Sequence, residues 1–424
     1  MNYQQALEYI NHTAQFGNKP GLERVAALLK AFGDPHKALK FVHIAGTNGK
    51  GSTCAMTESI LRTAGYKVGL YISPYLEDYR ERMQINREPI PAGTLAELIT
   101  QAAAFCAQLA DHPRKFEIET AVAMRYFADQ GCDIVVLEVG LGGRLDATNV
   151  ISAPEVAAIA SIAQDHVQVL GSDLGLIAYE KCGILKNGCH AVSCSAQHPA
   201  AAEVIERRCA EEDVPLSIAD ETALYVTDMG LYGSKFAYKR MSYEISLIGA
   251  HQLQNALTAI EIIIALQKRG WAIPQIAVRD GLSAARWSGR LEIIKEKPLC
   301  LIDGAHNLDA VSMLCGAIDG LMDGKKLITI MAMSRDKRYD ICAPMVARRS
   351  THFIATEFTG MHPVPAAELA KASLRCAYPV PEPLVIPDVE EAVRKALELA
   401  GPDDAVLACG SLYMIGEAKR VMLT

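Results

Sequence analysis

The chain has 424 residues, more than a single hydrophobic core usually serves, so we expect two domains. Apolar residues make up 50% of the sequence and charged residues 21%, a balance that is typical of globular proteins and disfavours long disordered tracts. The formal net charge of −7 disfavours a general nucleic-acid binder, which needs a basic face, but it allows a local basic pocket for an anionic small molecule.

Residues 1–15 are polar and amphipathic, and they lack the basic and apolar regions of a signal peptide. No apolar run is long enough to span a bilayer. The 12 cysteines are scattered singly without a C-x-x-C pair, which favours free thiols over disulfides or zinc ligands. We therefore expect a cytoplasmic protein without membrane or nucleic-acid partners.

Short β-branched runs alternate with helical stretches in the first part of the chain, a pattern that is typical of a parallel α/β sheet. Glu138 ends one of the expected strands, at the edge of the sheet where the ligands of open α/β folds gather. The expected strands cover residues 41–45, 67–72, 133–138 and 156–162, and the expected helices cover residues 52–64 and 116–130.

A second α/β alternation follows two more expected helices, at residues 251–269 and 274–285, and the turn-like sequence WSGR at residues 287–290. We place the domain boundary at this turn, which gives a first domain of residues 1–286 and a smaller second domain of residues 287–424. In the second domain the expected strands are residues 299–303, 326–331, 352–355 and 405–408, and the expected helices are residues 308–321, 389–399 and 411–421.

A glycine-rich segment, GTNGKGST at residues 46–53, lies between the first expected strand and the first expected helix. Glycines bring backbone N–H groups close to phosphate oxygens, and the helix N-terminus adds further N–H donors and partial positive charge. A general P-loop would have glycine at Ile44 and a hydroxyl residue at Gly51, so a serine-capped turn is the competing interpretation. The strand–loop–helix order and the central lysine favour phosphate binding, by Thr47, Asn48, Gly49, Lys50, Gly51 and Ser52.

The segment GTNGKGS resembles the phosphate loop of the muramyl-ligase-like ATP enzymes, and with its flanks it is similar to the folylpolyglutamate and dihydrofolate synthases. The similarity extends over nearly the whole chain, with the motifs in the family's order and spacing. They are HIAGTNGKGST at residues 43–53, LEVGLGGRLDATN at 137–149, SIAQDHVQVLG at 161–171, EKCGILK at 180–186, HQLQN at 251–255, WSGRLE at 287–292, DGAHN at 303–307 and GSLY at 410–413.

This resemblance implies a P-loop ATPase-like N-terminal domain with a parallel sheet, of the muramyl-ligase central type, and a smaller Rossmann-like α/β domain that serves glutamate ligation. It implies a ligase that uses ATP and Mg²⁺ to add L-glutamate to the γ-carboxylate of tetrahydrofolates through an acyl phosphate. Because one chain would hold a complete site, we expect a monomer. Relatives also join glutamate to dihydropteroate. The alternatives are a different muramyl-ligase-type amino-acid ligase, a P-loop phosphotransferase or NTPase, and a non-enzymatic nucleotide-binding module.

A carboxylate at the end of an apolar strand, such as Glu138, is costly to bury unless it binds a cation, and its hard oxygens suit Mg²⁺. The resemblance implies that Glu138, Ser73 and His166 hold magnesium near the ATP phosphates, with Ser52 of the loop and two ions in all. From the residues alone, His166 is better explained as a hydrogen-bonded histidine beside Asp165, and only the resemblance makes it a metal ligand.

Lys181 matches a lysine that carries a carbamate in this family; the alternative is a surface lysine paired with Glu180 or another carboxylate. The resemblance also assigns ATP contacts to Asn255, Arg290 and Asp303. Arg290 lies at the domain junction, where it can grip phosphate on closure or form an interdomain salt bridge. His306 is our candidate for contacting the transferring phosphate or the incoming amino acid.

Ser288 stands where the family usually has proline, and serine lacks the fixed φ of proline, so we expect a more flexible hinge. Arg114 and Lys115 stand where dihydrofolate synthases often carry Thr-Tyr, which weighs against the dihydropteroate reaction; the two cations can instead attract a glutamate tail. The positions that match substrate-binding residues of the family are Phe116, Glu117, Leu145, Asp146, Ala147 and, on the glutamate side, Ser411.

Overall fold

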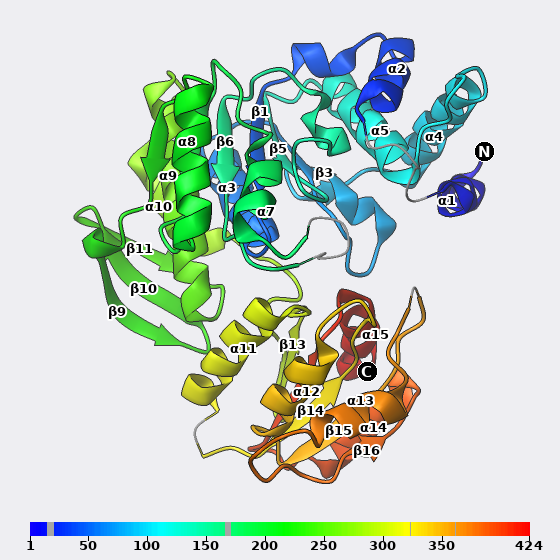
Figure 1. Cartoon of the computed structure of the whole chain (residues 1–424), viewed down its shortest axis with the longest axis vertical. Helices are drawn as coiled ribbons and strands as arrows, with labels where there is room; N and C mark the ends of the chain where they lie inside the picture. Colours follow the sequence, from blue (N-terminus) through cyan, green and yellow to red (C-terminus); the bar gives the residue numbers. More distant parts are fainter. Residues whose placement is uncertain (15–20, 166–170, 323, 361) are drawn as a thin grey trace.

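The computed structural model describes residues 1–14, 21–165, 171–322, 324–360 and 362–424. Figure 1 shows two lobes, one above the other, with the N-terminus in the upper lobe and the C-terminus in the lower one. Each lobe is built around its own central β-sheet with helices packed on its faces. In the described ranges, no helix combines the length and apolar character needed to cross a membrane.

The upper lobe contains an eight-stranded sheet with the strand order β4-β3-β2-β5-β1-β6-β7-β8. The six strands from β2 to β8 in this order run parallel, and β3 and β4 add an antiparallel edge. The strands are β1 (Phe41–Ala45), β2 (Val68–Tyr71), β3 (Met83–Ile85), β4 (Glu88–Pro89), β5 (Ile134–Glu138), β6 (Val156–Ile159), β7 (His190–Ser193) and β8 (Leu216–Ile218).

Successive side chains of the fully buried central strands point to opposite faces of the sheet and pack in different apolar clusters. Val42 and Ile44 of β1 pack with α3 (Lys50–Thr63), α9 (Ala250–Lys268) and α10 (Gln275–Ala284). Phe41 and the neighbouring Val135 and Leu137 of β5 point the other way. That second face is covered by α1 (Tyr3–His12), α2 (Glu23–Ala31), α4 (Ala92–Cys106) and α5 (Lys115–Asp129), and α7 (Leu174–Cys182) and α8 (Pro199–Glu211) cover the far end of the sheet.

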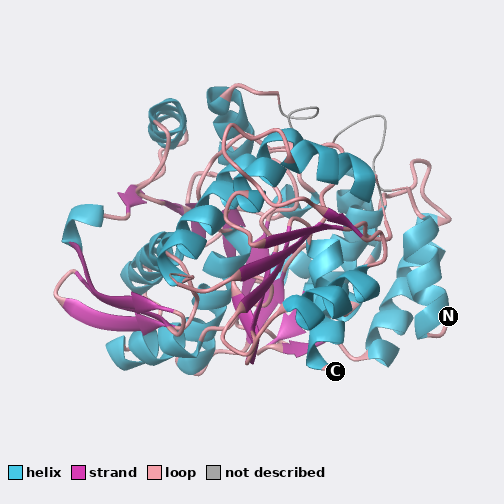
Figure 2. Cartoon of the chain, turned by 90° about the horizontal axis from the view of Figure 1, so that it is seen from below, coloured by secondary structure: helices cyan, strands magenta, loops and turns pink. Residues whose placement is uncertain are grey.

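An antiparallel three-stranded sheet projects from the side of the upper lobe, as Figure 2 shows. Its strands are β9 (Leu224–Gly230), β10 (Gly233–Tyr238) and β11 (Met241–Ile245). The lower lobe has a six-stranded sheet, β12-β13-β17-β14-β15-β16, parallel except at β12. Its elements are β12 (Glu292–Glu296), β13 (Leu299–Asp303), α11 (Leu308–Leu321), β14 (Leu327–Met331), α12 (Tyr339–Ala347), β15 (His352–Ala355), α13 (Ala366–Ser373), β16 (Leu384–Val385), α14 (Val389–Leu399), β17 (Ala405–Cys409) and α15 (Leu412–Leu423).

The expected α/β fold is confirmed, and each strand and helix predicted from periodicity is present, although the structure has further elements that were not predicted. Helix α3 begins at Lys50, two residues earlier than predicted, and β6 ends at Ile159 rather than at residue 162. The edge hairpin β3–β4 and the sheet β9–β11 were not predicted, because their strands are short or largely exposed and give a weak apolar signal. The proposed boundary at residues 286 and 287 falls between α10 and β12, and it stays a prediction.

Two helical glycines give a test of how tightly the upper lobe is packed. A Cβ at Gly281 of α10 would lie 2.5 Å from the Ile60 Cα of α3, whereas a Cβ at Gly316 of α11 meets nothing within 4 Å. We expect Gly281→Ala to destabilise the protein by about 1–3 kcal/mol through overpacking. Gly316→Ala should be neutral or stabilise it by roughly 0.5–1 kcal/mol, because alanine is the better helix former. Urea unfolding of both variants measures the two changes, and equal shifts would contradict the packing argument.

Candidate active site

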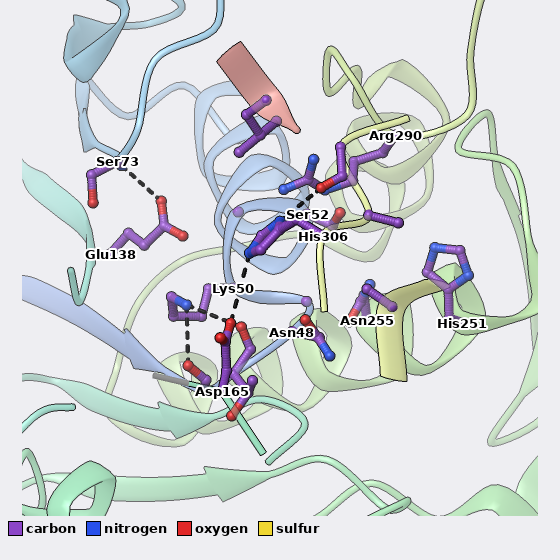
Figure 3. A pocket seen from close by; sticks show the side chains of 18 of the residues that line it. Asn48, Lys50, Ser52, Ser73, Glu138, Asp165, His251, Asn255, Arg290 and His306 are labelled. Atoms are coloured by element: carbon purple, nitrogen blue, oxygen red, sulfur yellow. Dashed lines mark hydrogen bonds and ion pairs between the residues drawn. The ribbon is translucent and has the colours of Figure 1, made fainter. Parts of the chain in front are cut away.

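A pocket lies between the two lobes at the carboxyl ends of β1 and β5, and we refer to it as the interlobe pocket (Figure 3). The upper lobe contributes the glycine-rich loop 46–52, Ser73 and Glu138 to its wall, and the lower lobe contributes Arg290 and His306. The parallel strands bring these polar groups together because their carboxyl ends share one edge of the sheet. The pocket is therefore where the two lobes can act on one ligand.

Hydrogen bonds hold the glycine-rich loop in place, but no side chain caps the start of α3. The N–H groups of Thr47 and Asn48 donate to the Ser161 carbonyl at 2.7 and 3.2 Å. The Lys50 amine donates to the carbonyls of Gly46 and Thr47 at 3.1 and 3.2 Å. No side chain caps the N-terminus of α3 at Gly49, so its first-turn N–H groups and the positive end of the helix dipole are available to an anion.

Two glycines of this loop are required for different reasons. Gly49 has φ of +83°, in the left-handed region, and a Cβ on it would lie 2.2 Å from the Asn255 amide oxygen. Gly51 has an ordinary φ, but a Cβ there would lie 2.7 Å from the Trp287 indole. The departure of Gly51 from the general P-loop template is thus explained by the indole that packs against the loop.

Glu138 ends β5 with a buried carboxylate, which accepts a hydrogen bond from the Ser73 N–H at 3.0 Å. Burial raises the pKa of Glu138, while Lys50, the Ser73 N–H and Arg290 act in the opposite direction. Ser52 lines the same pocket as Ser73 and Glu138. The two hydroxyls and the carboxylate are hard oxygen ligands, so these residues fit a magnesium ion whose coordination is completed by water or phosphate.

The remaining metal prediction, His166, lies outside the described residues. Within the described ranges, no group of three or more His, Cys, Asp and Glu side chains is placed to hold a metal ion. The metal prediction therefore depends on the set of Ser52, Ser73 and Glu138.

Lys181 is buried in α7, and its amine donates to the Gly46 carbonyl at 2.8 Å. Burial and then the nearby Lys50 lower the pKa of Lys181 to about 7, against the opposing effects of Asp165 and Asp146. The alternative of a surface lysine paired with Glu180 is wrong, because Glu180 pairs with the Arg144 guanidinium at 2.8 Å.

Polar side chains bridge the lobes at the floor of the pocket. Asp165 of the upper lobe pairs with the Lys337 amine at 2.5 Å and accepts from the Asn307 amide at 3.1 Å, and His306 points toward it at 3.7 Å (Figure 3). The Asn48 amide donates to the Asp309 carboxylate at 2.7 Å. The loop that is suited to phosphate is thus in direct contact with the lower lobe.

Comparison with known proteins identifies the fold and the family. The Mur ligase middle domain matches residues 44–263, and the glutamate ligase domain of Mur ligases matches residues 289–412. The dihydrofolate synthase/folylpolyglutamate synthase of Bacillus subtilis (strain 168) is 35% identical, over 99% of this chain and 98% of its own length. The chain belongs to the Mur ligase family, in its folylpolyglutamate/dihydrofolate synthase branch.

Two solved structures of Mur ligases of this branch have the same two-lobed fold. Folylpolyglutamate synthase of Mycobacterium tuberculosis, solved with ADP and AMPPCP, has a TM-score of 0.90 at 28% identity, over 99% of this chain and 98% of that one. E. coli FolC, solved with DHPP and ADP, has a TM-score of 0.87 at 29% identity, over 100% of this chain and 98% of that one. The expected N-terminal nucleotide-binding domain and α/β C-terminal domain are confirmed.

In the lower lobe of this Mur ligase, hydrogen bonds to Asp303 hold the turn that carries the predicted residue Arg290. The Asp303 carboxylate accepts from the N–H groups of Leu291 and Ala305 at 2.8 and 2.7 Å, so it ties the segment that carries Arg290 to the end of β13. The Arg290 guanidinium donates to the Gly289 carbonyl at 2.9 Å and lies close enough to lower the pKa of Glu138. His306 contacts the Gly304 carbonyl through Nδ1 at 2.8 Å.

The hinge is held by hydrogen bonds where the family's proline is missing. The Ser288 hydroxyl donates to Glu292 and accepts from the Lys419 amine at 2.9 Å, and Lys419 also pairs with Glu77 of the upper lobe at 2.8 Å. These contacts restrain the Ser288 side chain, and the more flexible hinge expected there stays a prediction.

The residues predicted to bind the pterin do not line the interlobe pocket. The Glu117 carboxylate is occupied by the buried Arg24 guanidinium at 2.7 Å and by the Arg114 N–H at 2.7 Å, so the geometry gives it a structural pairing. Asp146 accepts from the N–H groups of Leu141 and Thr148, within its own loop. The other predicted residues also stay predictions: Phe116 packs against Gly140 and Tyr71, Leu145 and Ala147 flank Asp146, and Ser411 is buried beside the pocket residue Leu412.

Sequence reasoning missed several residues that line or bridge the pocket. His251 and Gln252 lie in the HQLQN motif, from which only Asn255 was chosen, and both line the pocket. Burial lowers the pKa of His251, which favours its neutral form. Asp165 was noted only as a neighbour of His166, because the sequence does not show that Lys337 pairs with it.

The lowered pKa of Lys181 predicts a pH dependence of stability. The unfolded chain holds a proton on Lys181 up to pH 10.5, whereas the folded chain releases it near pH 7. Between these values the unfolded state binds more protons, so the free energy of unfolding rises with pH, by up to about 1.4 kcal/mol per pH unit. In CO₂-free buffer, the wild type should gain stability relative to Lys181→Met from pH 7 to 9. Urea unfolding at several pH values measures the difference, and parallel pH profiles would contradict the lowered pKa.

Proposed function

We propose that this Mur ligase uses ATP to join L-glutamate to the γ-carboxylate of a reduced folate. The observation that carries the proposal is the interlobe pocket, where an open helix N-terminus, two lysine amines and a buried carboxylate meet a domain of the glutamate ligase type. The activities for which the relatives are named and the nucleotides in their structures support this choice of substrates. We expect a monomer in the cytoplasm.

In this proposal, the open N–H groups at the start of α3 and the Lys50 amine hold the ATP phosphates. Lys50 exchanges the carbonyls of Gly46 and Thr47 for phosphate oxygens, which are the stronger acceptors. Arg290 approaches the phosphates from the lower lobe, braced by Asp303, so that charge neutralisation accompanies lobe closure. Asn255 holds the nucleotide beside Gly49.

Ser52, Ser73 and Glu138 would hold magnesium, which when bound neutralises phosphate charge and polarises phosphoryl oxygens. The Ser73 N–H keeps the Glu138 carboxylate turned toward the pocket. A second ion would require His166 or a modified Lys181, as the family resemblance implies.

Lys181 is suited to carbamylation because only a neutral amine attacks CO₂. Its nitrogen would bond to the carbon of CO₂ and release one proton, which converts a buried amine into an anion. A pKa of about 7 makes a large fraction of the amine neutral at physiological pH. The anion would be stabilised by Lys50 and by magnesium.

The reaction follows from the chemistry of a carboxylate and an amine, which do not condense readily in water. The γ-carboxylate of the folate attacks the γ-phosphorus of ATP, the bond between the β and γ phosphates breaks, and ADP leaves. The amine of glutamate then attacks the acyl carbon, phosphate departs, and the amine gives up a proton. The protein contributes positioning, charge neutralisation and exclusion of water rather than a covalent nucleophile. His306 lies where it can contact the transferring phosphate or the incoming amine.

The dihydropteroate reaction is a second candidate because the Bacillus subtilis relative carries both names. This chain has Arg114 and Lys115 in place of the Thr-Tyr pair of the dihydrofolate synthases. The Arg114 N–H donates to the Glu117 carboxylate, and the Lys115 amine donates to Asn11 at 2.8 Å. We therefore place the tetrahydrofolate reaction first.

Release of ADP should require glutamate and a pterin substrate together. The protein is incubated with ATP, Mg²⁺ and glutamate, and with a panel of reduced folates and dihydropteroate, each component being omitted in turn. ATP turnover that is independent of both glutamate and the pterin would favour a phosphotransferase or NTPase.

Lys50→Ala is expected to lower kcat by about 10²-fold or more, since it removes a cation from the phosphate site. Lys30→Ala, on the exposed face of α2, is the matched control and should keep wild-type turnover.

A carbamate on Lys181 has its own signature. Protein equilibrated with ¹³C-bicarbonate should give a carbamate carbon signal in NMR spectra that disappears on acidification. Lys181→Met should lack the signal, whereas Lys67→Met, which removes a partly exposed lysine of the same lobe, should keep it. An unchanged spectrum in Lys181→Met would remove the modification from the proposal.

A further inference from the structure

A buried hydrogen-bond chain lies behind the interlobe pocket and involves a histidine that the proposed mechanism does not use. His43, in the middle of β1, is fully buried, and its Nε2 lies 2.8 Å from the Thr148 hydroxyl. The Thr148 hydroxyl lies 2.5 Å from the Asp146 carboxylate, which also accepts from the Thr148 and Leu141 N–H groups at 3.0 and 2.8 Å. The chain thus links the strand of the phosphate loop to the loop 139–146.

The donor directions in this chain are fixed by the groups it contains. The Thr148 hydroxyl donates its one proton to the Asp146 carboxylate, so it must accept from His43. His43 therefore carries its proton on Nε2, and its Nδ1 is a buried atom without a partner among the described residues. Burial lowers the pKa of His43 to about 3, which keeps the ring neutral.

The loop that Asp146 holds is docked on the helix that carries Lys181. The Arg144 N–H donates to the Glu180 carbonyl at 2.7 Å. A Cβ at Gly143 would lie 3.0 Å from the Lys181 Cα, and a Cβ at Gly183 would lie 2.3 Å from the Arg144 Cα, so each backbone fits only against a glycine. A shift of this loop must therefore move the backbone around Lys181.

A hydrogen bond from Lys181 connects this helix back to the strand that carries His43. The Lys181 amine donates to the carbonyl of Gly46, three residues after His43 in the same chain segment. The contacts run from His43 through Thr148 and Asp146 to the loop, then to Lys181 and back to the phosphate loop. Three separate segments of the chain, residues 43–46, 139–148 and 180–183, are thus joined in one ring, in which the closest backbone contacts are made at glycines. A ring of this kind restrains the position of the amine, and reactions at a phosphate site depend on accurate positioning.

We infer that His43 and Thr148 are positioning residues for Lys181: their hydrogen bond to Asp146 sets the position of the Lys181 amine beside the phosphate loop. The inference rests on the proposed function for its effect on catalysis. Neither residue lines the interlobe pocket, so they act through the loop and not on the substrate.

Thr148→Val removes the hydroxyl at nearly constant volume, and Thr148→Ser keeps it. Thr57→Val is the matched control, since Thr57 is a buried threonine of the same lobe whose hydroxyl has no partner among the described residues. Urea unfolding establishes that each variant is folded. Two readouts then follow: the kcat and KM of the ligase reaction, and acetylation of Lys181 by acetic anhydride in CO₂-free buffer, in which the amine carries no carbamate. Acetylation is measured by peptide mass spectrometry against the other lysines.

Folded Thr148→Val is expected to lose about 10-fold to 100-fold in kcat with nearly constant KM for glutamate, and to show several-fold faster acetylation of Lys181. Thr148→Ser should recover most of both values, and Thr57→Val should resemble the wild type. Thr148→Val with wild-type kcat and wild-type acetylation would overturn the inference and leave the chain a role in stability alone. If the wild type proves inactive as a ligase, the proposed function fails, while the acetylation of Lys181 still decides whether the ring holds the amine.

Discussion

Two lysine amines converge on a single backbone carbonyl, that of Gly46, at 3.1 Å for Lys50 and 2.8 Å for Lys181. A carbonyl oxygen is a weak counter-charge for two nearby cations in a partly buried site. The burial of Lys181 and its nearness to Lys50 both lower its pKa, and loss of its proton lessens the repulsion between the two amines. The pocket therefore favours a ligand with several negative charges, and the open N-terminus of α3 faces the same space.

The contacts between the lobes are of a kind that can be exchanged for contacts with a ligand. Asn48, Asn307, Asp309, Asp165 and Lys337 meet through hydrogen bonds and an ion pair, while the large apolar clusters belong mainly to one lobe or the other. Parting the lobes would therefore expose polar groups to water at little cost. Because Asn48 belongs to the phosphate loop, a bound nucleotide would compete directly for one of these bridges, which links occupancy to lobe movement.

The parts of the fold that were predicted from the sequence are those in which local pattern and burial agree. The strands β1, β5 and β13 are fully buried apolar runs, and α9 carries a long apolar face, so periodicity locates them. The sheet β9–β11 escaped prediction because most of β9 is exposed and its residues alternate poorly. The loop, Lys181 and Glu138 were predicted because each motif is contiguous. The pairing of Glu117 with Arg24 joins residues 93 positions apart, and the pairing of Asp165 with Lys337 joins residues 172 positions apart, so neither leaves a local signal.

Trp287 shows how the hinge and the phosphate loop are mechanically connected. Its indole packs where a Cβ of Gly51 would be, and the Arg87 guanidinium of the β3–β4 turn lies 5.7 Å from its ring and donates to the Arg286 carbonyl at 2.8 Å. Three residues further along, Arg290 faces Glu138 across the pocket. A rotation of the lower lobe about this segment is therefore transmitted to the first turn of α3 and to the guanidinium together, because a tightly packed indole moves with its neighbours instead of yielding. The glycine at position 51, which looks like a defect against the general P-loop template, is what allows this coupling.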